Sequence, residues 1–200
     1  MKIYQFVFDG REQLLHYYYK GEALIRKGYP LFLPNTSPEE CYVAYPSLLV
    51  RIGRTGREFA SRFSHRYING LGVGFDIVHH NRLCDLIAAR QPWSEAVAFE
   101  YAAAGIIEDC FLDEGGLQPN YHLEWGEWDL EVTETMIRKA VERMSYLNII
   151  HVGDILLDRP QILQHPALQV EQNYRVNAPG LGEYTLRVKY EFLLLRLTPV

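Results

Sequence analysis

Three glycines at alternate positions, Gly70, Gly72 and Gly74, lie in an apolar segment that leads to Asp76. Alternate residues of a β-strand point to the same face of the sheet, so glycines at this spacing leave one face without side chains. Another backbone or a ligand can approach such a face closely. An apolar segment over residues 45–52 predicts a second strand just before it in the chain. We therefore expect the core to be organised around these two strands.

The composition predicts one globular domain over residues 1–200, because 48% of the residues are hydrophobic. A net charge of -5 without a basic run argues against nucleic acid or an anionic membrane as a partner. No apolar run is long enough to cross a bilayer. The three cysteines, Cys41, Cys84 and Cys110, are widely spaced and form no CxxC motif. We expect reduced thiols in a cytoplasmic protein.

Several further elements follow from local patterns. Leu14, Leu15, Tyr18 and Leu24 share a helical face and predict a helix over residues 12–26. A helix is also predicted over residues 133–144, with Thr133 as its N-cap and with charged residues on its outer face. Alternating residues around Gly126 predict a hairpin. The core strands are predicted at residues 2–7, 45–52, 71–76 and 182–192.

Scaffold motifs resemble those of the fumarylacetoacetate hydrolase family. They are the run Phe-Ser-His-Arg-Tyr over residues 63–67, Pro92-Trp93, and a Thr-x-x-Met-Ile segment at Thr133 followed by Gly153-Asp154. The resemblance covers about residues 2–190. It implies an α+β, mostly β fold, in which mixed strands form a sandwich or barrel-like roll with flanking helices. It also implies a structural role for His65.

The resemblance breaks down at the positions that carry the chemistry. The family holds a divalent cation, commonly Mg or Mn, with Glu-x-Glu on one strand and Asp on the next. Here these positions are Tyr45, Ser47 and Asp76, so one carboxylate remains. The substrate-binding lysine and a serine of the family fall on Val97 and Ala102. A single carboxylate leaves most of the oxygen shell of Mg to water, so we expect weak divalent-metal binding or none.

Two functions of different classes are compatible with this pattern. The first is a divergent member with little or no catalytic activity, which acts as a binding or regulatory subunit in a homodimer or with a related subunit. The second is a metal-dependent hydrolase, decarboxylase or isomerase of keto acids with a rebuilt site. Helical spacing would place His79 or His80 beside Asp76, where they could share a metal ion. We expect the first function, and a structural Asp76 bonded to backbone donors or to one of these histidines.

Further polar residues carry expectations about the substrate region and the surface. Asp158 and Arg159 replace a family segment that holds a substrate carboxylate. Asp158 is expected to repel an anionic substrate, and Arg159 is expected to form a surface ion pair. Glu39 and Glu40 are the carboxylates nearest to the missing pair, and they are expected to lie in a solvated loop. Residues 17–19 are three tyrosines, for which aromatic packing with hydroxyls in water is expected.

Overall fold

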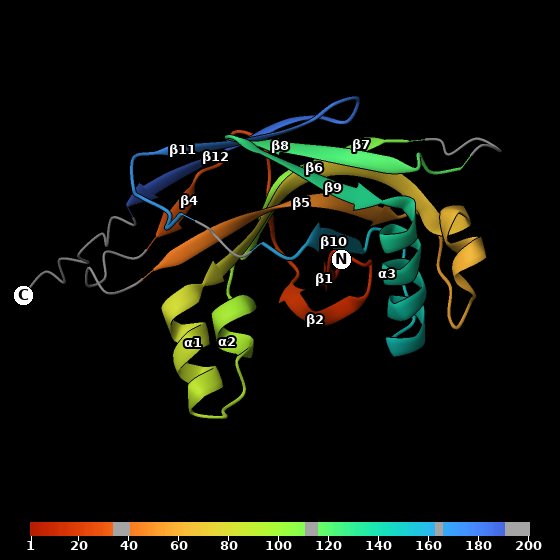
Figure 1. Cartoon of the computed structure of the whole chain (residues 1–200), viewed down its shortest axis with the longest axis horizontal. Coiled ribbons are helices and arrows are strands. Elements are labelled where there is room, and N and C mark those ends of the chain that lie inside the picture. The colour runs from red at the N-terminus through yellow and green to blue at the C-terminus, as the bar shows by residue number, and fades with distance from the viewer. Residues whose placement is uncertain (34–40, 111–115, 163–165, 191–200) are drawn as a thin grey trace, which may run out of the picture.

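The computed structural model describes residues 1–33, 41–110, 116–162 and 166–190. Its larger sheet has seven strands in the order β2-β1-β10-β5-β6-β7-β3 and curls into a half-barrel (Figure 1). These strands are β1 (Ile3–Phe8), β2 (Leu14–Gly21), β3 (Leu24–Ile25), β5 (Tyr42–Ile52), β6 (Ile68–His79), β7 (Ala103–Asp109) and β10 (Ile155–Pro160).

A second sheet lies over the first, in the order β4-β12-β11-β8-β9 (Figure 1). Its strands are β4 (Leu31–Leu33), β8 (Asn120–Trp125), β9 (Trp128–Thr133), β11 (Asn173–Ala178) and β12 (Gly182–Tyr190). The helical elements are the 3-10 helix η1 (Ser61–Tyr67) and the α-helices α1 (His80–Ala88), α2 (Ser94–Val97) and α3 (Glu134–Leu147). No helix among the described residues is both long and apolar enough to cross a membrane.

The main core fills the space between the two sheets. Ala44, Leu48 and Val50 of β5 belong to it, together with Leu123 and Tyr184 of the second sheet. Because side chains alternate along a strand, the residues between them on β5 face the other side, which is the inside of the curled sheet. That inner face carries two small apolar clusters and the polar residues described below.

The predicted strands are confirmed, with β6 extending to His79 and β5 beginning at Tyr42. Residues 191 and 192 of the last predicted strand lie outside the described residues, as do Glu39 and Glu40. The hairpin is β8–β9, and Gly126 has a positive φ of 61°. Helix α3 is also confirmed, and the Thr133 hydroxyl accepts a bond from the Met136 N–H at 3.3 Å.

The helix predicted over residues 12–26 is wrong. The segment forms β2, antiparallel to β1, and then β3 at the opposite edge of the same sheet. The Asp9 carboxylate accepts the Arg11 and Gln13 N–H groups and so fixes a tight turn that starts β2. Consecutive tyrosines favour a pleated surface, and pairing with β1 satisfies their backbone groups. Tertiary context therefore outweighs the helical spacing of the leucines.

The alternate glycines of β6 permit a close approach of backbone, as their spacing predicted. A Cβ added at Gly72 would lie 1.9 Å from the Ile106 carbonyl oxygen, and one added at Gly74 would lie 1.9 Å from that of Ala104. Both oxygens belong to β7, the next strand of the sheet. The missing side chains thus let β6 and β7 curl around the inner face.

We predict that Gly74→Ala lowers the free energy of unfolding by at least about 2 kcal/mol, because the new methyl group overlaps fixed backbone. Urea denaturation would measure the change. Gly10→Ala is the matched control, since no atom lies within 4 Å of the added Cβ. Equal stability of the two variants would contradict the close approach.

Candidate functional site

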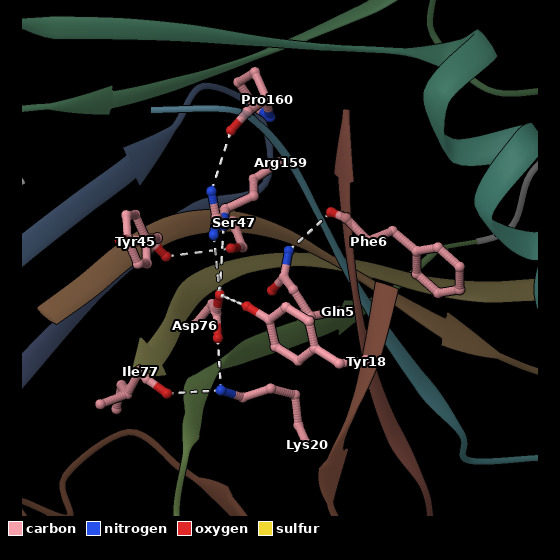
Figure 2. A network of polar contacts seen from close by, with 10 residues as sticks. All are labelled: Gln5, Phe6, Tyr18, Lys20, Tyr45, Ser47, Asp76, Ile77, Arg159 and Pro160. Carbon is pink, nitrogen blue, oxygen red and sulfur yellow. Dashed lines mark hydrogen bonds and ion pairs between the residues drawn. The ribbon is translucent and has the colours of Figure 1, made fainter. Parts of the chain in front are cut away.

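A cluster of polar side chains lies on the inner face of the curled sheet (Figure 2). Asp76 is its centre, and the register of β5 and β6 places Tyr45 directly opposite it. Arg159 enters from β10, while Tyr18 and Lys20 enter from the edge strand β2. Strand β2 can reach β6 only because the sheet curls, since β1, β10 and β5 separate these two strands within the sheet.

Both oxygens of the Asp76 carboxylate are bound by neighbouring side chains. The Lys20 ammonium lies 2.6 Å from Oδ1, and the Tyr18 hydroxyl donates to Oδ2 at 2.6 Å. The Nε and one terminal nitrogen of Arg159 each lie 3.4 Å from Oδ2. The side chains of Lys20 and Asp76 are 0% exposed, so this is a fully buried ion pair.

Burial and charge act in opposite directions on the two partners. Burial alone would raise the pKa of Asp76, but the charges of Lys20 and Arg159 hold it below its ordinary value. Burial lowers the pKa of Lys20 and Arg159 lowers it further, while Asp76 opposes the shift. Lys20 also donates to the Ile77 carbonyl at 2.6 Å. The carboxylate is thus the ionised anchor of the cluster.

The cluster holds two cations and one carboxylate, which gives it one excess positive charge. Arg159 uses its donors weakly, since its contacts to Asp76 and to the Pro160 carbonyl measure 3.4–3.5 Å, beyond the usual 2.7–3.2 Å or so of N–H···O bonds. Its guanidinium lies 4.0 Å from the centre of the Tyr45 ring. Arg159 therefore has capacity for an additional anionic acceptor.

Three of the predictions for this region need correction. Asp76 is bonded to Lys20, Tyr18 and Arg159, rather than to backbone donors or to a histidine. Arg159 does not form a surface ion pair, because it is 5% exposed and contacts Asp76 inside the curled sheet. Tyr18 likewise directs its hydroxyl to a buried carboxylate and not to water. The strand geometry of β2 and β10 brings these distant residues to one face.

The helical spacing proposed for Asp76, His79 and His80 does not occur. Strand β6 continues through His79, and residues three apart on a strand face opposite sides. The His79 ring stacks on Tyr42, with 4.4 Å between ring centres. His80 begins α1, with its Nε2 3.6 Å from the Cys84 sulfur. Within the described part of the chain, no three His, Cys, Asp or Glu residues are grouped to hold a metal ion.

The donor set around Asp76 does not fit a divalent cation. Tyr45 places its ring against Arg159, and the Ser47 hydroxyl donates to the Tyr45 carbonyl at 3.2 Å. Val97 and Ala102 are each 1% exposed, and Val97 belongs to an apolar cluster with Tyr45. In addition, the Lys20 ammonium contacts Oδ1 of Asp76, an oxygen that a metal ion would need as a ligand.

Asp158 faces the opposite side of β10 from Arg159 and lies in the core between the sheets. It is 0% exposed, and neither carboxylate oxygen has a hydrogen-bond partner among the described residues. Burial raises its pKa well above the ordinary value for Asp. Burial therefore favours the neutral carboxylic acid form of Asp158. The sequence predicts that Asp158 repels an anionic substrate. In the structure its side chain points away from the cluster instead, into the core.

Sequence reasoning missed Lys20, which contributes the closest charge to Asp76. Its signal was its two-residue spacing from Tyr18, which places both side chains on one face of a strand. The helical interpretation of residues 12–26 concealed that relation.

Comparisons with known proteins identify the fold. No protein-family model and no curated protein matches the chain. Among solved structures, it is similar to a fumarylpyruvate hydrolase from Pseudomonas aeruginosa in complex with Mn2+ and pyruvate. That match has 18% identity and a TM-score of 0.75, and it covers 96% of this chain and 90% of the other.

Two isomerases are also similar. A 5-carboxymethyl-2-hydroxymuconate delta-isomerase from Mycobacterium smegmatis has 16% identity and a TM-score of 0.73, with 95% of this chain and 79% of that chain covered. A 2-hydroxyhepta-2,4-diene-1,7-dioate isomerase from Mycobacterium marinum has 15% identity and a TM-score of 0.71, with 96% and 75% covered. The chain therefore has the fold of the fumarylacetoacetate hydrolase family, as its scaffold motifs implied.

We predict that Asp76→Asn lowers the free energy of unfolding by about 3–5 kcal/mol, because two buried cations lose their carboxylate. Urea denaturation at neutral pH would measure the loss. Asp109→Asn, which removes an exposed partner of Arg51, should change stability little. An Asp76→Asn variant as stable as the wild type would show that the cluster does not hold the curled sheet together.

The raised pKa of Asp158 predicts a defined pH dependence of stability. A carboxyl group with a raised folded-state pKa releases a proton on unfolding, so wild-type stability falls as pH rises above about 4. Asp158→Asn removes this loss. The variant should therefore gain stability relative to the wild type between pH 4 and pH 7, as measured by urea denaturation at both pH values. The exposed Asp85→Asn should show no such gain, and an equal effect of the two variants would refute the assignment.

Proposed function

We propose that this chain binds a small carboxylate of the keto-acid class on the inner face of its curled sheet, without a divalent cation. The observation that carries the proposal is the pairing of two buried cations, Lys20 and Arg159, with the single carboxylate of Asp76. An excess buried charge is costly, and an anionic ligand would neutralise it. Arg159 is the binding contact, because a guanidinium fork matches the two oxygens of a carboxylate.

The neighbouring groups support this assignment of roles. Lys20 and Tyr18 hold the Asp76 carboxylate, which leaves Arg159 for the ligand. His16 is exposed on the same face of β2, and its ring stacks on Tyr18 with 6.0 Å between ring centres. Burial and the charge of Arg159 lower the pKa of His16, so its imidazole is neutral near pH 7. A ligand would reach Arg159 past this uncharged side chain.

The chemical class of the ligand is inferred from the similar structures. The Pseudomonas aeruginosa hydrolase was solved with pyruvate, which is a 2-keto acid, and with Mn2+. In our proposal, the protein's own cations take over the charge that the metal supplies there. The similarity to these solved structures establishes the fold. The ligand class is our inference from it.

Two candidate functions remain within this proposal. An enzyme would convert the bound keto acid, whereas a binding or regulatory subunit would only bind it. The similar structures are named as hydrolases and isomerases, and they support an enzyme better than a non-catalytic subunit. In that case Arg159 would stabilise the negative charge of an enolate. The side chains of Tyr45 and Ser47, in place of two carboxylates, support the binding or regulatory role.

We also propose self-association, either as a homodimer or with a related subunit. Large apolar side chains are exposed near β4 at the edge of the second sheet, with Phe32 at 55% and Tyr190 at 47%. Sedimentation as a strict monomer at high concentration, with no partner recovered, would count against this part of the proposal.

Calorimetry with pyruvate in the presence of a chelator tests the proposal. Binding should persist without metal, and Arg159→Gln should weaken it by roughly 10- to 100-fold through the loss of charged hydrogen bonds. Arg143→Gln is the matched control, because Arg143 lies over the Tyr17 ring at a different site. Binding that requires Mn2+, or that survives in Arg159→Gln, would overturn the proposal. A separate assay distinguishes the two candidate functions. Turnover of fumarylpyruvate in the presence of the chelator would favour the enzyme over the binding subunit.

A further inference from the structure

Two cysteines and a histidine meet where β5 begins and α1 begins. The His80 N–H donates to the Cys41 carbonyl at 2.7 Å, immediately before β5. Cys84 lies one helical turn after His80, and its sulfur is 3.6 Å from the His80 Nε2. Cys84 is exposed and Cys41 is half-buried. Both cysteines therefore contact the same histidine, Cys41 through its main-chain carbonyl and Cys84 through its sulfur, although 43 positions separate them in the sequence.

The two thiols differ in their readiness to react. Burial raises the pKa of Cys41, and the nearby Cys84 raises it further. Burial thus favours the protonated thiol form of Cys41. Cys84 is accessible to solvent and has an imidazole nitrogen within hydrogen-bond range. A solvent-exposed thiol beside a histidine is the environment in which a cysteine becomes nucleophilic.

We propose that Cys84 and Cys41 form a peroxide-sensitive thiol pair, with Cys84 as the reacting thiol and Cys41 as the resolving thiol. In the first step the Cys84 sulfur attacks hydrogen peroxide. The O–O bond breaks, the sulfur is oxidised to sulfenic acid and water leaves. The Cys41 sulfur then attacks the Cys84 sulfur, so that an S–S bond forms and the hydroxyl leaves as water with the thiol proton. Two thiols and one peroxide thus give one disulfide and two waters.

The pair lies next to an open cavity of the fold. Tyr42 and His79, the neighbours of Cys41 and His80 in the chain, line a cavity of about 950 Å³ with Phe99. A disulfide would fix the start of β5 to α1 at this wall. This inference is independent of the carboxylate proposal, because the thiol pair and the Asp76 cluster share no side chain.

The full-length protein should be treated with one equivalent of hydrogen peroxide at neutral pH, alkylated and mapped by mass spectrometry. We expect a Cys41–Cys84 disulfide and an alkylated Cys110. Cys110 is the internal control, because it is half-buried, burial raises its pKa and no histidine contact is recorded for it within the described residues. Equal oxidation of all three cysteines, or no disulfide between Cys41 and Cys84, would overturn the proposal.

Variants separate the two roles. Cys41→Ser should stop the reaction at a Cys84 sulfenic acid that dimedone traps, whereas Cys84→Ser should prevent oxidation of Cys41. His80→Gln should slow the first step by at least about tenfold, because it removes the imidazole that assists proton transfer. His122→Gln, which alters an exposed histidine paired with Asp129, is the control and should not change the rate. A Cys84 that reacts at the wild-type rate in His80→Gln would exclude activation by His80.

Discussion

The buried ion pair between Lys20 and Asp76 joins parts of the sheet that are not neighbours. Lys20 is on the edge strand β2, and Asp76 is on β6 near the opposite edge. Removing either charge would leave the other buried and unpaired, which costs far more than the net contribution of the intact pair. The pair therefore fixes how far the sheet curls, and it requires Tyr18 and Arg159 to be held beside it.

The same pair decides which chemistry the inner face can support. Proteins of this fold are named as hydrolases and isomerases, and one was solved with Mn2+. Here an ammonium occupies the contact to the remaining carboxylate, and aromatic and hydroxyl side chains stand at the other two positions. The cations at this face are thus side chains of the protein itself, Lys20 and Arg159. A chelator cannot remove a cation that is part of a side chain, so the proposed carboxylate binding would not depend on metal supply.

Curling of the sheet has a second requirement, which is the absence of side chains on β6. The glycines let the carbonyl groups of β7 approach within a distance that a Cβ would forbid. Without that approach, β2 would not meet β6, and Lys20 would face water. The curled sheet therefore depends both on the glycines of β6 and on the ion pair between Lys20 and Asp76.

The sequence by itself determined the elements whose signals are local. Alternate glycines predicted the close packing of β6, Thr133 and its apolar face predicted α3, and the scaffold motifs predicted the fold. Only the tertiary structure decided that residues 14–21 form a strand, because pairing with β1 and not local spacing stabilises them. That decision brought Tyr18 and Lys20 to Asp76, and the register of β10 brought Arg159 inward. The partners of a buried charge lie far apart in the chain, so no local pattern could name them.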